Sequence, residues 1–165
     1  MNVICLDTNI LVWGVQKQSS SNRKDKIPQA KQLIATLQAN KNSVIIPTVV
    51  LAELLMGCQQ IYKSKVLNDL EHFSKIVPFD AAAAYIYSEL SDEKWGVRQE
   101  LKIQREKMKF DMMVVATAIS QKAECIYAGD DDIFKIVEGS NVASSLQVRP
   151  MPPYQPSLFD YAQGN

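Results

Sequence analysis

Four carboxylates of this chain border or interrupt apolar runs, where charged side chains are uncommon. They are Asp7, Glu53, Asp111 and Asp130. Carboxylates gathered in a medium of low dielectric constant repel one another, and they take up protons unless a cation neutralises them. Binding sites made only of oxygen ligands suit the hard ions Mg²⁺ and Mn²⁺. The four residues therefore predict a site for one of these ions.

Each carboxylate also has a simpler explanation. Asp111 and one residue of 130–132 could cap the helices that follow them, which is the commonest role of an aspartate before an apolar run. Asp7 could begin a turn together with the two polar residues after it. Glu53 is harder to explain, because a charge inside an apolar helical turn is seldom buried without a partner such as lysine or arginine.

The apolar pattern predicts strands that alternate with helices along most of the chain. Strands are expected near residues 2–6, 44–46, 76–79, 125–128 and 146–148. Helices are expected near residues 10–15, 28–39, 49–56, 61–74, 81–95, 111–121 and 132–137, with helix or loop at 99–109. Thr48 and Asp80 are expected to cap the helices after them. Unbroken apolar strands are typical of a parallel sheet covered on both faces. We therefore expect an α/β fold, a three-layer α/β/α sandwich with a central, mainly parallel sheet of about five strands.

The predicted elements bring the four carboxylates to one edge of that sheet. Asp7 and Asp130 each follow a strand, while Glu53 and Asp111 lie in or at the start of adjoining helices. Sites in parallel sheets form at the carboxyl ends of the strands. A single crevice can therefore hold all four side chains, and this favours a metal site over separate caps and turns.

Composition limits the remaining possibilities. With 165 residues and 47% hydrophobic content, the chain suits one domain, predicted at 1–150, followed by a proline-rich tail at 151–165. Eighteen basic and eighteen acidic residues cancel, so an anionic substrate must be held locally. The single histidine, His72, argues against zinc, and three cysteines without CxxC spacing suggest reduced thiols. We see no signal peptide or transmembrane segment and expect a cytoplasmic protein without membrane contact.

Four segments resemble the motifs of one known family. They span residues 6–11, 47–54, 111–118 and 126–134. In this order and at these separations they resemble the PIN domain family of metal-dependent ribonucleases, especially the VapC-type toxins, over residues 3–148. The resemblance implies a five-stranded parallel sheet between helices, Mg²⁺ or Mn²⁺ as cofactor, an RNA substrate, an antitoxin protein as partner, and a homodimer.

The resemblance also assigns roles to single residues. The family's four acids correspond to Asp7, Glu53, Asp111 and Asp130, and Asn9 matches the polar residue that accompanies the first acid. We expect Asp7, Asp111 and Asp130 to bind the ion. Glu53 is expected to complete the site directly or through water, and to orient or deprotonate the attacking water.

Two departures from the family pattern lie near the fourth acid. Ala128 stands where the family usually has threonine or serine, so a hydroxyl that would orient water or a carboxylate is missing. Asp132 follows closely and could replace or supplement Asp130. The polar stretch at 19–26 is also longer than in small toxins of the family.

Other polar residues are candidates for substrate binding. Thr8, Asn9 and Thr117 could contact phosphate or the carboxylates. Basic residues before Asp111 could hold the nucleic-acid backbone; these are Arg98, Lys102, Arg105, Lys107 and Lys109. The alternative is a solvated helix face, because acidic residues alternate with them.

These features together predict a metal-dependent endoribonuclease, the toxin component of a toxin-antitoxin pair. One alternative is a PIN nuclease in RNA processing or DNA repair. Another is a PIN-like binding module that has lost catalysis, which the Ala128 departure would favour.

The tail suggests a further partner. Gln155, Leu158 and Phe159 fall in a segment that resembles the peptide by which bacterial proteins dock on the DNA sliding clamp. The alternative is that Leu158, Phe159 and Tyr161 pack on the domain or on a second subunit.

Overall fold

The computed structural model describes residues 2–156, and its centre is a sheet of five parallel strands. The strands are β1 (Val3–Leu6), β2 (Ser43–Pro47), β3 (Lys75–Val77), β4 (Cys125–Tyr127) and β5 (Gln147–Arg149). They lie in the order β3-β2-β1-β4-β5, and every strand pair is parallel. The predicted α/β fold with a parallel sheet is confirmed.

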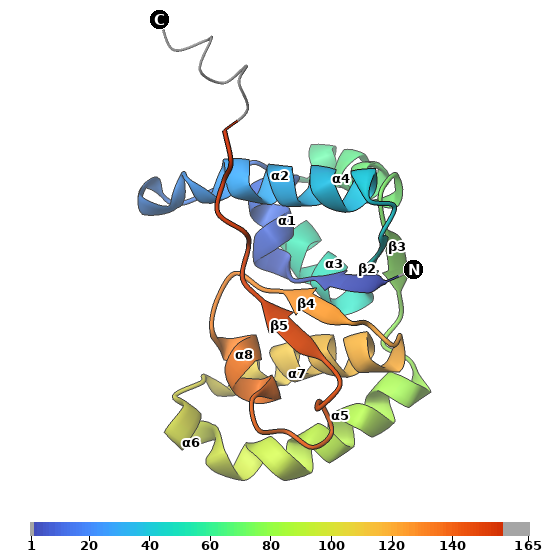
Figure 1. Cartoon of the computed structure of the whole chain (residues 1–165), viewed down its shortest axis with the longest axis vertical. Coiled ribbons are helices and arrows are strands. Elements are labelled where there is room, and N and C mark those ends of the chain that lie inside the picture. Colours follow the sequence, from blue (N-terminus) through green and yellow to red (C-terminus); the bar gives the residue numbers. More distant parts are fainter. Residues whose placement is uncertain (1, 157–165) are drawn as a thin grey trace, which may run out of the picture.

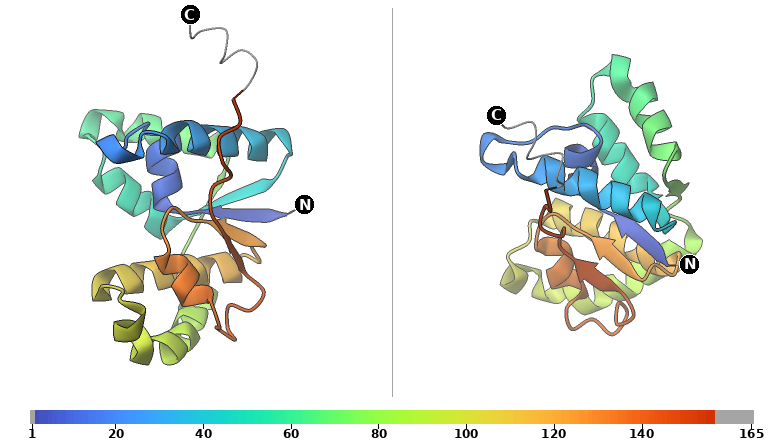
Figure 2. Two further views of the ribbon diagram at one scale, coloured as in Figure 1. Left: turned by 60° about the vertical axis from the view of Figure 1, so that its left-hand side comes forward. Right: turned by 45° about the horizontal axis from the view of Figure 1, so that its top comes forward.

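Helices cover both faces of this sheet. They are α1 (Thr8–Gly14), α2 (Lys26–Ala39), α3 (Thr48–Met56), α4 (Lys63–Glu71), α5 (Ala81–Lys94), α6 (Arg98–Leu101), α7 (Arg105–Ser120) and α8 (Asp132–Val137). Short 3₁₀ turns form at η1 (Ser21–Arg23), η2 (Gln60–Tyr62) and η3 (Trp95–Val97). Figures 1 and 2 show α1, α2 and α4 on one side of the sheet and α5, α7 and α8 on the other. Helix α3 contacts both α1 and α7, so its side chains can reach groups from both layers.

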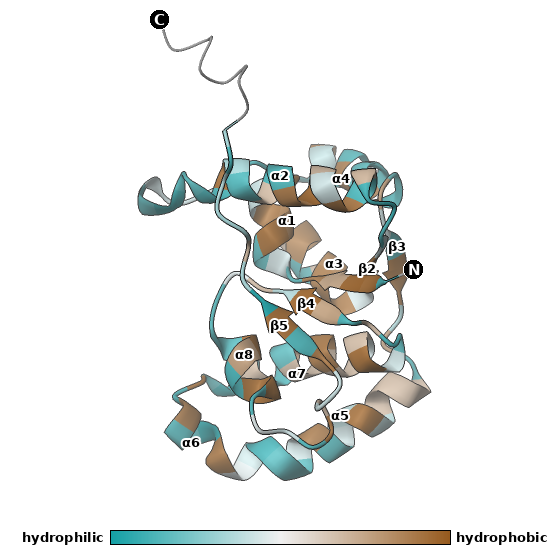
Figure 3. Ribbon diagram, in the orientation of Figure 1, coloured by the Kyte–Doolittle hydropathy of each residue, from teal (hydrophilic) through white to brown (hydrophobic). Residues whose placement is uncertain are grey.

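The apolar strands and the inner helix faces form one core, and Figure 3 shows the hydrophobic residues gathered on the strands and on α7. Leu6, Ile46 and Ile126 are fully buried in neighbouring strands. Cys5 and Cys125 are buried free thiols, and the free thiol of Cys58 is half-buried. Within residues 2–156, no helix is long and apolar enough to cross a membrane.

The order of the strands determines where a site can form. The chain starts at β1 in the centre, builds β2 and β3 to one side, and then places β4 and β5 on the other. Such a reversal leaves a crevice at the carboxyl ends of the central strands. Asp7 follows β1 at this point, and its amide donates to the Tyr127 carbonyl of β4 at 3.1 Å.

Two predicted helix starts need correction. Helix α7 begins at Arg105 rather than at Asp111, because good helix formers precede Asp111 and the buried Met108 anchors them to the core. Asp111 therefore cannot be a helix cap. Thr48 is not a cap either, since its hydroxyl accepts a hydrogen bond from the Phe79 amide at 3.3 Å. Asp80 does cap α5, accepting from the Ala83 amide at 2.9 Å.

Gly129 lies where the loop after β4 passes α1. A Cβ at this position would lie 2.6 Å from Asn9 Cβ and 2.7 Å from a ring carbon of Trp13, which is buried. Gly129→Ala should therefore lower the free energy of unfolding by about 1–3 kcal/mol, as overpacking does, and displace Asn9 and Asp130. Urea unfolding measures the effect. Gly96→Ala is the control, because a Cβ there meets no atom within 4 Å; equal stability of the two variants would contradict the prediction.

The chain beyond β5 runs across α2. The side-chain amide of Gln32 donates to the Gln155 carbonyl at 2.8 Å and accepts from the Gln155 amide at 2.9 Å. These two bonds hold residues near 155 against the helix. Leu158, Phe159 and Tyr161, on which the predicted tail contacts depend, lie outside the described residues.

Candidate functional site

A cavity of about 760 Å³ opens at the carboxyl ends of the central strands. Its wall includes all four predicted carboxylates, which are Asp7, Glu53, Asp111 and Asp130. They come from the end of β1, from α3, from α7 and from the loop after β4. The structure thus brings together four acids that are widely separated in the sequence.

Asp7 and Asp111 are the buried members of this group, with 5% and 3% of their surface exposed. Burial raises the pKa of Asp7 to about 6, and the carboxylates of Asp130 and Glu53 act in the same direction, whereas Lys107 opposes them. Burial raises the pKa of Asp111 to about 7, although Lys107 again lowers it. The fold itself therefore disfavours two negative charges here, and a cation would stabilise them.

Lys107 supplies one such cation. It precedes Asp111 by one helical turn, and its Nζ lies 3.0 Å from Asp111 Oδ2 and 3.0 Å from Asp130 Oδ2. Asp132 Oδ2 is 3.4 Å from the same nitrogen. Burial alone would lower the pKa of Lys107, but the adjacent Asp111 and Asp130 carboxylates raise it above its ordinary range.

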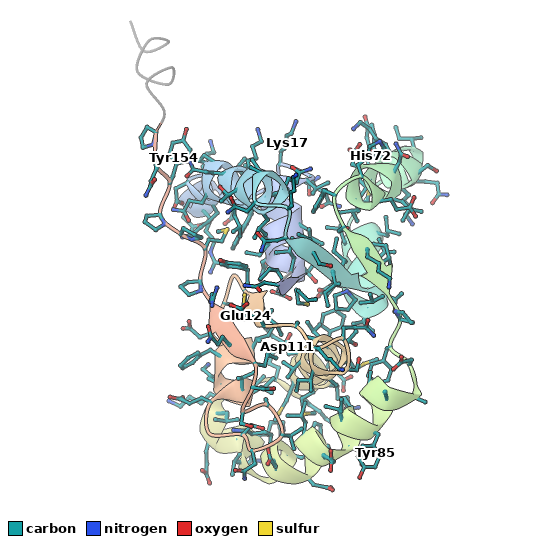
Figure 4. The ribbon with its side chains drawn as sticks, turned by 45° about the vertical axis from the view of Figure 1, so that its right-hand side comes forward. Lys17, His72, Tyr85, Asp111, Glu124 and Tyr154 are labelled. Carbon is teal, nitrogen blue, oxygen red and sulfur yellow. The ribbon has the colours of Figure 1, made fainter. Side chains whose placement is uncertain are left out.

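The donor set suits a divalent ion. Within residues 2–156, no three acidic, histidine or cysteine side chains stand close enough together to hold a metal as they are. The Lys107 ammonium lies 3.0–3.4 Å from the carboxylate oxygens of Asp111, Asp130 and Asp132. Bonds from oxygen to Mg²⁺ are only about 2.1 Å long, so these oxygens would have to move closer together to bind the ion. The oxygens nevertheless converge on a single cation. His72 directly follows the outer helix α4, far from Asp111 (Figure 4), so the carboxylates must act without imidazole.

Thr8 and Asn9 on α1 orient two of the carboxylates. The Thr8 hydroxyl donates to Glu53 Oε2, and Asn9 Nδ2 donates to Asp130 Oδ2 at 3.3 Å. The Asp132 amide adds a bond of 3.1 Å to Asp130 Oδ1. Asp130 is therefore held by Asn9, by the Asp132 amide and by Lys107. These contacts form although Ala128 provides no hydroxyl.

The environment of Glu53 differs from the prediction. We expected a charge buried in an apolar helix, but Glu53 is exposed, while Val50 and Leu54 face the core. Residue 53 lies about 100° around the helix from residue 54, at the border of the buried face, and its side chain lines the cavity. Glu53 still lines the cavity, because α3 packs against α7.

Asp130 and Asp132 are not equivalent. Asp130 lines the cavity, whereas Asp132 begins α8 and is not part of the cavity wall. Although burial raises the pKa of Asp132, its ion pairs with Lys135 and Lys107 hold the value below the ordinary one. The Lys135 pair is 3.0 Å long. This geometry favours Asp130 as the fourth acid, with Asp132 in support.

Several predicted substrate contacts lie elsewhere. Thr117 is fully buried and donates to the Met113 carbonyl at 2.7 Å, and it does not line the cavity. Arg105 lies 5.8 Å from the centre of the Trp95 ring, and Lys109 pairs with Glu106 at 3.7 Å. Neither lines the cavity. Of the five basic candidates, Lys107 alone does so.

Seven cavity residues were not identified from the sequence. Arg23 comes from the polar loop at 19–26 and Glu106 from α7, while the others form an apolar wall; these are Val49, Ala52, Met56, Phe110 and Met113. Arginine binds phosphate well, and apolar or aromatic surfaces accept nucleotide bases. The only sequence signal was the unusual length of the polar loop.

Comparisons with known proteins agree with this architecture. A family model described as the PIN domain matches residues 4–139. The structure of VapBC2 from Rickettsia felis bound to a DNA fragment from its promoter is similar, with a TM-score of 0.65, 21% identity, and 91% of this chain and 99% of that chain covered. DNA-bound VapBC from Salmonella typhimurium has a TM-score of 0.61 and 15% identity, with 92% and 100% covered. These identities show similarity of fold alone. No curated protein matches the chain significantly.

Proposed function

This chain belongs to the PIN domain family, whose members are nucleases, and we propose that it is a metal-dependent endoribonuclease and the toxin of a toxin-antitoxin pair. The observation that carries the proposal is the cavity in which four acids from distant segments meet. Three carboxylates, two of them from outside α7, already share one cation there. Phosphodiester hydrolysis with a divalent ion uses such an arrangement.

Each acid has a proposed role. Asp7, Asp111 and Asp130 would hold Mg²⁺ or Mn²⁺, with Asp132 in support. The bound ion would supply a Lewis acid that makes water nucleophilic near neutral pH and stabilises charge on the phosphoryl oxygens. Glu53 is exposed in the cavity and held by Thr8, so it is placed to orient or deprotonate the attacking water. Asn9 keeps Asp130 turned toward the site.

Arg23 and the apolar wall support a nucleic-acid substrate. Arg23→Ala should raise KM about fivefold and leave kcat nearly unchanged, because an exposed phosphate contact contributes up to about 1 kcal/mol to ground-state binding. Steady-state cleavage of a short labelled RNA measures both constants. Lys24→Ala is the control, since Lys24 is the adjacent exposed cation and does not line the cavity. Equal KM values for the two variants would remove Arg23 from the substrate site.

The antitoxin proposal has two supports. Both similar structures contain VapBC complexes. This chain also exposes large apolar side chains at the end of α3 and in the turn that follows it, with Met56 83%, Ile61 76% and Tyr62 52% exposed. Met56 lines the cavity, and exposed apolar side chains of this kind are typical of a binding surface. Co-expression with the product of a small open reading frame directly upstream should yield a complex that no longer cleaves RNA. The predicted homodimer can be tested by sedimentation of the free chain.

One experiment separates the candidate functions. The purified chain is incubated with labelled RNA and with labelled DNA, in Mn²⁺ or in chelator. We expect RNA cleavage that requires Mn²⁺. Cleavage of DNA alone would favour a repair nuclease, for which the sliding-clamp tail was the indication. Binding of RNA without any cleavage would favour the inactive binding module that the Ala128 departure suggested.

A further inference from the structure

We propose that Lys107 is a built-in counter-cation, which occupies the cation position among the carboxylates until a divalent ion displaces it. The inference rests on the proposed function, because it concerns how the same site is loaded. In this proposal the chain has a resting form with the ammonium bound and an active form with the metal bound.

The contacts of Lys107 differ from those of an ordinary surface ion pair. Its ammonium meets Asp111, Asp130 and Asp132, from α7 and from the segment that leads into α8. Lys65 on α4 offers a comparison, because it also pairs with an aspartate four residues later, Asp69 at 2.7 Å. That pair is isolated, with side chains 71% and 42% exposed, whereas the Asp111 side chain beside Lys107 is only 4% exposed.

The surroundings of Lys107 require a positive charge. Asp7, Glu53 and Glu106 also line this cavity, and Arg23 is the other basic residue in its wall. Lys135 pairs with Asp132 Oδ1, whereas Lys107 contacts Asp132 Oδ2. Without the Lys107 ammonium, the buried Asp111 and its neighbours would face one another with much less compensation.

A divalent ion and the ammonium cannot share these oxygens. Both need the same lone pairs of Asp111 and Asp130, and two cations at such short range repel each other strongly. Lysine has a flexible four-carbon stem, and the Lys107 side chain is already 38% exposed. It can therefore leave toward solvent without unfolding α7. Metal binding and Lys107 binding should consequently compete.

Competition predicts a gain of metal affinity when the lysine is removed. In calorimetric titration of the metal-free full chain with Mn²⁺ alone, Lys107→Gln should bind about tenfold more tightly than wild type. The same variant should melt at a lower temperature than wild type in chelator, and saturating Mn²⁺ should close this gap. Lys65→Gln, the matched control, should leave the Mn²⁺ affinity unchanged.

A second measurement needs no variant. Acetic anhydride labels exposed amines, and mass spectrometry reads the labelling of each lysine in the wild-type chain. Saturating Mn²⁺ should raise the labelling of Lys107 roughly twofold, since less than half of its side chain is exposed before displacement. The labelling of Lys65 should stay constant. Unchanged or reduced labelling of Lys107 in Mn²⁺ would overturn the displacement.

The outcomes distinguish this inference from the function it rests on. If wild type and Lys107→Gln bind Mn²⁺ equally well, the role of Lys107 is wrong and the metal site stands. If neither protein binds Mn²⁺, the metal-dependent mechanism and the counter-cation fail together. Tighter binding by Lys107→Gln, together with increased labelling of Lys107 in the wild type, supports both.

Discussion

Asp7→Asn should lower the rate of RNA cleavage by at least about 100-fold, because even partners outside the direct metal contacts contribute 10-fold to 100-fold. Asparagine has nearly the same shape but lacks the charge that a divalent ion requires. Asp7 is the acid at the centre of the sheet, where the strand order reverses, and it lines the cavity with the other three. Single-turnover cleavage of labelled RNA in Mn²⁺ gives the rate.

The same substitution should not destabilise the metal-free protein. Burial raises the pKa of Asp7 from 3.8 to about 6, so the ionised side chain disfavours the folded state by about 3 kcal/mol at neutral pH. Asparagine avoids that cost, and urea unfolding in chelator should show equal or greater stability. Asp131→Asn is the matched control, because Asp131 is exposed, neighbours the fourth acid and makes no side-chain cap. Cleavage by Asp7→Asn at the rate of Asp131→Asn would exclude Asp7 from catalysis.

The metal-free protein should lose stability as the pH rises from about 4 to 7. Asp7 and Asp111 have folded-state pKa values near 6 and 7, above the ordinary 3.8. Between these values the folded chain binds more protons than the unfolded chain, so the free energy of unfolding decreases with pH. The decrease attributable to Asp7 alone is about 3 kcal/mol, and the dependence ends above the folded-state pKa values. The pKa of Asp132 is lowered, so this residue makes the free energy of unfolding increase with pH, but only below its ordinary pKa.

Urea unfolding in chelator, at pH values between 4 and 8, tests this dependence. The double variant Asp7→Asn, Asp111→Asn should flatten the curve, and Asp131→Asn should leave it unchanged. Saturating Mn²⁺ should also reduce the slope, because bound metal stabilises the ionised carboxylates. Wild-type stability that stays constant or rises with pH over this range would show that folding does not raise the pKa values of the two aspartates.

Local sequence determined the strands and most helix positions of this protein. A strand of a parallel sheet is buried on both faces, so it reads as an unbroken apolar run, and β1, β2 and β4 were recognisable on that basis. The acids were recognisable because they end or interrupt those runs. Asp80 was found as a cap because the pattern that makes a cap is local.

Tertiary structure alone decided what each acid faces. Helix α7 extends six residues before Asp111. Because of this extension, Lys107 lies one helical turn before Asp111 and pairs with it, and the Lys107 ammonium also contacts Asp130 and Asp132. The exposure of Glu53 and the burial of Thr117 depend on the rotation of α3 and α7 against their neighbours. Phe110 reaches the cavity although its sequence context does not indicate this, and for Arg23 the length of its polar loop was the only indication. Sequence patterns report contacts within one element, while the packing angle between elements determines which side chains meet in a cavity.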